Sequence, residues 1–246
     1  MSINDLPVLD SRSALFLDFD GTLAEIAPRP EAVALLPGIV PALIALQRRL
    51  GGALALISGR PIDQLDTFMQ PLSLPMAGVH GVERRGADGT LSRVAAPALD
   101  ALEREAQALA DAHPGVLVER KPGALALHYR LSPQSECLCL ALMQRAVQDS
   151  SQLSLLHGNK VVEVKPAGAT KGHAIADFLQ EPPFAGRRPV FAGDDTTDEA
   201  GFAVAQQHGG EGIKVGQGPT LARHRVANPS ALLDWLRNGA ARLVGA

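Results

Sequence analysis

Four groups of polar residues could do chemistry together, because each stands directly after an apolar run or near the start of an expected helix. The groups are Asp18 with Asp20, Ser58 with Gly59 and Arg60, Lys171, and Asp194 with Asp195 and Asp198. Neighbouring carboxylates repel one another unless a cation or a shared proton lies among them. Carboxylate oxygens suit Mg²⁺, whereas a lysine and a hydroxyl suit the oxygens of a phosphate. Together the groups indicate a site for Mg²⁺ and a phosphate.

Asp18 and Asp20 end the apolar run over residues 14–17 and are followed at once by Gly21. If the strand continued through them, its alternation would turn both side chains to the same face. Open α/β sheets place their chemistry at this end of their strands. Taken alone, an aspartate here is often only a turn former or a helix cap. The presence of the other three groups favours a functional role.

Strands and helices alternate in the parts of the chain that carry these groups. Apolar spacing predicts helices over residues 37–50, 62–69, 170–179, 199–208 and 231–243. Buried strands are expected over residues 14–17, 53–57, 74–79, 189–192 and 212–215. This order predicts an α/β fold with a parallel, doubly wound sheet.

The middle of the chain has a different pattern. Helical spacing alternates there with hairpin signals, over residues 97–113, 116–129, 133–147 and 153–164. A turn signal at Asp88-Gly89 predicts one more hairpin over residues 83–94. The α+β pattern indicates a smaller domain inserted into the first. The expected parts are therefore a core over 1–96, the inserted domain over 97–167 and the rest of the core over 168–246.

Composition argues against several classes of partner. With 46% hydrophobic and 20% charged residues the chain is an ordinary globular protein. A net charge of −3 and 4% aromatic residues give no basis for binding nucleic acid. We see neither a secretory signal nor the apolar run of about 18 residues that spans a membrane, so we expect a cytoplasmic monomer with a small-molecule substrate. Cys137 and Cys139 suit neither a disulfide framework nor a zinc site.

The four groups resemble, in order, the motifs of the haloacid-dehalogenase-like (HAD) phosphohydrolases. The matching segments are Asp18-Phe19-Asp20-Gly21-Thr22-Leu23, Ser58-Gly59-Arg60, Lys171-Gly172 and Gly193-Asp194-Asp195 with Asp198. The resemblance implies a Rossmann-like core, with a mainly parallel sheet flanked by helices, and an inserted cap domain. It also implies that Asp18 attacks phosphorus and that Asp20 carries the proton.

The same resemblance implies the remaining roles at the site. Mg²⁺ would be held by Asp18, the backbone carbonyl of Asp20, and Asp194. The phosphate would be held by Ser58, Gly59 and Lys171. Two further carboxylates would lie behind the metal or orient the lysine, namely Asp195 and Asp198.

Further segments, three of them wholly or partly in the inserted domain, are similar to those of one family within this superfamily, the trehalose-6-phosphate phosphatases. They are Gly78-Val79-His80-Gly81-Val82-Glu83, Glu119-Arg120-Lys121, His128-Tyr129-Arg130 and Glu163-Val164-Lys165-Pro166. This similarity implies trehalose biosynthesis and a set of sugar contacts: Arg60, His80, Glu119, Lys121, Arg130 and Glu163. One departure is Val79, where some members have asparagine before the histidine.

Two alternative functions stay open on the sequence. A phosphatase of the same chemistry could act on another sugar phosphate, such as sucrose 6-phosphate or mannosylglycerate phosphate. A non-catalytic phosphosugar-binding module could keep the fold, but it would not need Asp18 and Asp20, and both are present. The charged residues of the inserted domain also have an ordinary alternative as a surface salt-bridge network.

Overall fold

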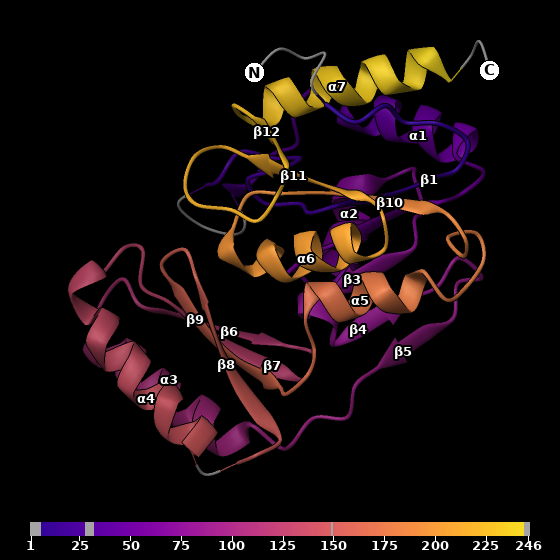
Figure 1. The fold of residues 1–246 in the computed structure, drawn as a ribbon. Helices are drawn as coiled ribbons and strands as arrows, with labels where there is room; N and C mark the ends of the chain where they lie inside the picture. Colours follow the sequence, from indigo (N-terminus) through magenta and orange to yellow (C-terminus); the bar gives the residue numbers. More distant parts are fainter. Residues whose placement is uncertain (1–5, 28–31, 149, 244–246) are drawn as a thin grey trace. The chain divides into compact units, whose positions relative to one another are not determined.

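The computed structural model describes residues 6–27, 32–148 and 150–243. The chain divides into two compact units, Met1–Ser92 with Thr170–Ala246, and Arg93–Ala169. The expected inserted domain, residues 97–167, falls inside the second unit. Figure 1 shows the elements of both units, coloured along the sequence. Among the described residues, no helix is both long enough and apolar enough to cross a membrane.

The first unit is built on an eight-stranded sheet with the order β12-β11-β10-β1-β2-β3-β4-β5 among the described residues. Its strands are β1 (Ser13–Leu17), β2 (Leu54–Ile57), β3 (Met76–Gly78), β4 (Glu83–Arg85), β5 (Leu91–Arg93), β10 (Arg188–Gly193), β11 (Glu211–Val215) and β12 (His224–Val226). From β12 to β3 all neighbours are parallel, and β4 is antiparallel to β3. The predicted mainly parallel α/β sheet is confirmed. The short strand β12 was not expected.

Helices lie on both faces of this sheet, and Figure 1 shows α1 with α7 on one face and α5 with α6 on the other. The bounds are α1 (Ile39–Arg49), α2 (Ile62–Met69), α5 (Lys171–Phe178), α6 (Glu199–Gln207) and α7 (Pro229–Arg242). Helix α1 buries Ile39, Leu43 and Leu46, which recur at helical spacing on its inner side. It stops where Gly51 and Gly52 adopt positive φ values of 58° and 87°. That conformation favours glycine and ends the helix as predicted.

Strand β1 lies in the middle of the core and is buried along its whole length. Because helices cover both faces, its residues form a continuous apolar run and do not alternate with polar ones. The ring of Phe16 lies 5.3 Å from that of Phe184 and 6.0 Å from that of Phe178, measured between centroids. This aromatic packing helps to fix the point at which the chain leaves β1 and enters the aspartate segment.

The second unit has its own antiparallel sheet, with the order β6-β7-β9-β8. Its elements are α3 (Asp100–Ala112), β6 (Leu117–Lys121), β7 (Ala124–His128), α4 (Glu136–Gln148), β8 (Leu153–Gly158) and β9 (Val161–Pro166). Val162 and Val164 join a separate hydrophobic core with residues of α3 and α4. Since neighbouring residues of a strand point to opposite faces, Glu163 and Lys165 lie on the face away from that core. The predicted α+β character of this segment is confirmed.

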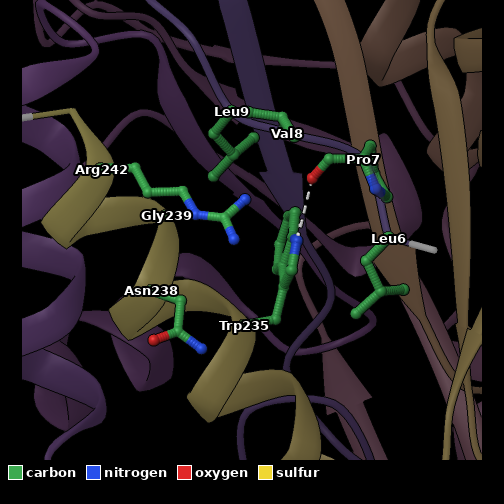
Figure 2. A pocket seen from close by; sticks show the side chains of 8 residues that line it. All are labelled: Leu6, Pro7, Val8, Leu9, Trp235, Asn238, Gly239 and Arg242. Carbon is green, nitrogen blue, oxygen red and sulfur yellow. Dashed lines mark hydrogen bonds between the residues drawn. The ribbon is translucent and has the colours of Figure 1, made fainter. Parts of the chain in front are cut away.

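The segment before β1 packs on helix α7. The indole Nε1 of Trp235 donates a hydrogen bond of 3.0 Å to the carbonyl of Pro7, which Figure 2 marks with a dashed line. A pocket of about 20 Å³ lies beside this contact, lined by Leu6, Pro7, Val8, Leu9, Trp235, Asn238, Gly239 and Arg242. A space of this size suits a water molecule or two and no metabolite. None of the predicted site residues lines it.

Helix α7 begins with a side-chain cap that can be tested. The side-chain oxygen of Asn228 accepts the backbone N–H of Ala231 at 3.0 Å. We expect Asn228→Ala to lower the free energy of unfolding in urea by about 1 kcal/mol, because that N–H loses its partner. Asn238→Ala is the matched control, since Asn238 lies exposed within the same helix. It should change stability by less than about 0.5 kcal/mol. Equal losses in the two variants would contradict the capping role.

Candidate active site

The two aspartates of the first motif lie just beyond β1, because the strand ends at Leu17. Strand alternation therefore does not set the directions of their side chains, and a shared face stays a prediction. The backbone N–H of Asp18 still donates to the carbonyl of Ala192 at 2.9 Å, and Asp20 forms an isolated β-bridge with Ala24 across a turn. Gly21 forms this turn with a φ of 78°, and a Cβ there would lie 2.1 Å from the Asp194 carboxylate. The segment can therefore pass close to Asp194 only as glycine.

Lys171 lies between two buried carboxylates. Its Nζ is 2.6 Å from Oδ1 of Asp18 and 2.6 Å from Oδ1 of Asp198. Thr22 donates a further hydrogen bond of 3.1 Å to Oδ2 of Asp18. Burial and the charge of Asp198 raise the pKa of Asp18 well above its usual range, although Lys171 opposes this. Burial alone would lower the pKa of Lys171, but Asp18 and Asp198 raise it above its usual value, so the lysine is a cation.

Asp194 adds a third carboxylate to this cluster. Ligand atoms of Asp18, Asp194 and Asp198 all lie within 4.8 Å of one another. Oδ1 of Asp194 is buried and has no hydrogen-bond partner among the described residues. Burial and the charge of Asp198 raise the pKa of Asp194 to about 7. Three carboxylates beside one lysine, with a buried oxygen left unpartnered, fit a divalent cation with oxygen ligands.

Asp195 and Asp198 shape the turn that follows β10, the short 3₁₀ helix η5 (Thr196–Asp198). Asp195 accepts the N–H of Thr196 at 2.7 Å, and Oδ2 of Asp198 accepts the N–H of Asp195 at 2.9 Å. This reciprocal capping holds Asp198 where its other oxygen meets Lys171. Asp195 is thus a turn former in the described structure, and Asp198 contacts the lysine directly.

Ser58 and Gly59 follow β2 and form a tight loop before α2. Ser58 is buried, and its Oγ accepts the backbone N–H of Arg60 at 3.1 Å. A Cβ at Gly59 would lie 2.5 Å from Nε2 of His80, so only glycine leaves room for that ring. Arg60 is predicted as a sugar contact, whereas the structure places its guanidinium on Asp20, with two contacts of 2.7 Å. Its sugar role stays a prediction.

His80 lies in the 3₁₀ turn η3 (Val79–Gly81) that follows β3. Val79 and His80 both have positive φ, 49° and 56°. Asparagine tolerates this backbone, but a β-branched valine is strained there. The departure at Val79 therefore falls on a residue whose conformation suits the asparagine of other members. Nearby, the buried Glu83 accepts the N–H of Ile62 and so caps α2.

The second unit gathers charged residues on the face of its sheet away from its core. Register places Glu119 opposite Ala126 and Ala126 opposite Glu163, so these three share one face. Nζ of Lys121 lies 2.7 Å from Glu163 and 3.7 Å from Glu119. Oε1 of Glu163 is buried without a hydrogen-bond partner among the described residues. The group thus contains a buried carboxylate oxygen that a polar ligand would satisfy.

Other predicted sugar contacts are placed differently. Arg130 donates to the carbonyl of Asn159 at 2.7 Å, and no described contact joins it to Glu119, Lys121 or Glu163. His128 was not predicted as a site residue, yet its Nε2 lies 2.7 Å from Glu119. The strand register would have indicated His128. Residues two apart on one strand share a face, and His128 lies two residues after Ala126, the partner of Glu119.

Two further residues of the first unit were missed from the sequence. Thr22 lies within the first motif, and its position four residues after Asp18 was the available signal. Lys214 is buried on β11 and donates to the backbone carbonyl of Asp194. No motif marks Lys214, because the contact depends on β11 lying beside β10.

Comparisons with known proteins identify the family of this chain. A family model described as trehalose-phosphatase matches residues 16–234. The chain belongs to the trehalose-phosphatase family. Trehalose-6-phosphate phosphatase of Escherichia coli (strain K12) is 45% identical over 238 residues, 95% of this chain and 89% of that protein. A probable trehalose-phosphate phosphatase of Sinorhizobium fredii (strain NBRC 101917 / NGR234) is 45% identical over 220 residues, 89% of this chain and 83% of that one.

Solved structures agree on the trehalose-phosphatase fold. The C-terminal domain of trehalose-6-phosphate phosphatase of C. albicans matches with a TM-score of 0.82 at 20% identity, covering 94% of this chain and 92% of that one. A haloacid dehalogenase-like hydrolase from B. subtilis matches with a TM-score of 0.66 at 12% identity, covering 91% and 99%. At these identities the likeness concerns the fold alone. The resemblance to the trehalose-6-phosphate phosphatases is confirmed by the family model and by the curated relatives.

The lysine cluster generates a stability prediction. We expect Asp198→Ala to lower the free energy of unfolding by roughly 3 kcal/mol, because it leaves Lys171 buried with one carboxylate fewer. Urea denaturation followed by circular dichroism measures the loss. Asp234→Ala is the control, since its pair with Arg237 spans 4.0 Å and is more than half exposed. It should cost less than about 1 kcal/mol. A loss no larger for Asp198→Ala would show that the buried cluster does not stabilise the fold.

Proposed function

We propose that this chain hydrolyses trehalose 6-phosphate to trehalose and phosphate, as a step of trehalose biosynthesis. The observation that carries the chemistry is the buried cluster of Asp18, Lys171 and Asp198 beside the unpartnered oxygen of Asp194. Family membership and the names of the relatives support the substrate. The cytoplasmic location and the monomeric state stay predictions.

Asp18 is the proposed nucleophile. One of its oxygens attacks phosphorus, the bond from phosphorus to the sugar oxygen breaks, and an aspartyl phosphate forms. Asp20 gives a proton to the departing sugar oxygen and later takes one from the water that hydrolyses the aspartyl phosphate. Asp20 is suited to this task, because its side chain is 39% exposed and so within reach of a substrate.

Lys171 and Ser58 are the proposed phosphate contacts. The ammonium of Lys171 already touches Asp18 at 2.6 Å, so it lies beside the proposed nucleophile. Its positive charge would offset the charge that gathers on the phosphoryl oxygens in the transition state. The Ser58 hydroxyl and the Gly59 backbone would bind the remaining oxygens.

Asp18, the backbone carbonyl of Asp20, and Asp194 are the proposed residues that hold Mg²⁺. The bound ion would supply positive charge that neutralises and orients phosphoryl oxygens. Lys214 supports this arrangement, because it fixes the backbone carbonyl of Asp194. Asp195 and Asp198 have supporting roles. Asp195 stabilises the turn after β10, and Asp198 orients Lys171.

The inserted domain, residues 97–167, is proposed to recognise the sugar. The contacts would come from the group formed by Glu119, Lys121 and Glu163. A disaccharide offers many hydroxyls, and charged groups that are already partly dehydrated reject a ligand that leaves them unpaired. Glu163 is 3% exposed, and one of its oxygens has no hydrogen-bond partner within the described part of the chain, which suits a sugar hydroxyl as donor. His80 and Arg130 stay as further predicted contacts.

The function is tested by phosphate release from a panel of sugar phosphates. We expect purified protein with Mg²⁺ to release phosphate from trehalose 6-phosphate at least about tenfold faster than from sucrose 6-phosphate, mannosylglycerate phosphate or glucose 6-phosphate. A chelator should abolish release, because three carboxylates without a cation repel phosphate.

Asp18→Asn is the control for this panel, since its loss of all release excludes a contaminating phosphatase. Release from the other sugar phosphates with none from trehalose 6-phosphate would support the alternative substrate. Binding without release from any of them would support the phosphosugar-binding module.

The inserted domain makes a separate prediction. We expect Glu163→Gln to raise KM for trehalose 6-phosphate about tenfold, because a charge-assisted hydrogen bond becomes a neutral one. Turnover of p-nitrophenyl phosphate, which has no sugar, should stay unchanged. Glu105→Gln is the matched control, because Glu105 is exposed on α3 and pairs loosely with Arg145 at 3.3 Å. Equal effects of Glu163→Gln on the two substrates would show that Glu163 does not take part in sugar recognition.

A further inference from the structure

Arg60 holds both oxygens of the Asp20 carboxylate. Its Nε lies 2.7 Å from Oδ2, and its second terminal nitrogen lies 2.7 Å from Oδ1. Two parallel charge-assisted bonds of this kind fix the plane of a carboxylate, not only its position. The Arg60 side chain is 9% exposed and that of Asp20 is 39% exposed. The arginine therefore holds the aspartate from the inner side, while part of the aspartate stays open to solvent.

The guanidinium is itself held in place. Its central carbon lies 5.4 Å from the ring centre of Phe19 and 5.3 Å from that of Phe68. These rings are 5.0 Å apart and attract a cation near their faces. Gln64, one turn further along α2, accepts from Arg60 at 3.4 Å. The arginine thus has little freedom to leave Asp20.

The backbone of the same residue reaches the phosphate loop. The N–H of Arg60 donates to Oγ of Ser58 at 3.1 Å. One residue therefore links the proton-carrying carboxylate of the first motif to the hydroxyl of the second. This link fixes the distance between the group that handles the proton and a group that is proposed to hold the phosphate.

We propose that Arg60 is a positioning residue for Asp20, which keeps the carboxylate aligned with the oxygen that leaves phosphorus. A carboxylate offers about four lone-pair sites and the arginine uses two, so proton transfer stays possible on the others. The inference rests on the proposed function. It replaces direct sugar recognition as the main role of Arg60.

The test uses leaving groups that differ in their need for a proton. Phenyl phosphate and p-nitrophenyl phosphate both lack a sugar, but phenolate is the poorer leaving group and needs protonation more. We expect Arg60→Met to lower kcat/KM for phenyl phosphate about 30-fold, less than the whole contribution of acid catalysis because Asp20 itself remains, and for p-nitrophenyl phosphate less than about threefold. Arg60→Lys keeps the positive charge but not the two parallel hydrogen bonds of the guanidinium. Its kcat/KM for phenyl phosphate should therefore lie between those of Arg60→Met and the unchanged protein.

Arg85→Met is the matched control. Arg85 donates two hydrogen bonds of 2.6 and 2.7 Å to the carboxylate of Asp66, and the Asp66 side chain is also 39% exposed. This control should leave turnover of both aryl phosphates unchanged. A second measurement uses trehalose 6-phosphate in the Asp20→Asn background, where Arg60→Met should change kcat/KM less than about threefold. If Arg60→Met does not fold, Arg60→Lys replaces it in every comparison.

Equal losses on the two aryl phosphates, or the same loss with and without Asp20, would overturn the positioning role. If Arg60→Met raised only the KM for trehalose 6-phosphate, the result would contradict the positioning role and support a direct contact between Arg60 and the sugar. Turnover of trehalose 6-phosphate by the unchanged protein is measured in the same series. Its absence would reject the proposed function, an outcome distinct from failure of the inference.

Discussion

The site depends on one ammonium held between two buried carboxylates. Asp18 follows β1, Asp198 follows β10, and Lys171 is the first residue of α5, so each charge comes from a different element. Burying a charge costs several kcal/mol unless a partner meets it with good geometry. The three elements must therefore reach their final places together, and the register of β1 against β10 serves both the core and the chemistry.

The same constraint explains why the neighbouring backbone has so little room. A Cβ at Gly193 would lie 2.3 Å from the Asp198 carboxyl carbon, and one at Gly21 would lie 2.1 Å from an Asp194 oxygen. Both glycines let the chain approach a carboxylate that another residue needs. The cluster still has more negative than positive groups, since Asp194 adds a third acid beside Lys171. This excess is what a bound cation would relieve.

Much of this arrangement could be predicted from the sequence, because it is local or follows from strand order. Helix α2 begins and ends at the predicted residues, and the four motif groups meet in one unit. Contacts between distant side chains could not be predicted. Arg60 meets Asp20 across 40 positions of the chain, and no spacing rule announces a partner that tertiary packing selects. Strand β12 was missed because its residues, His224–Val226, contain no apolar run.

The two separate hydrophobic cores have a consequence for how such a protein can change over generations. The face that carries Glu119 and Glu163 belongs to a sheet stabilised by its own helices. Exchanges on that face leave untouched the packing around Phe16 that fixes Asp18. On the proposed function, a lineage can therefore acquire a new preference among sugars while the residues that break the phosphate ester are inherited unaltered, so selectivity and reactivity are free to evolve at different rates.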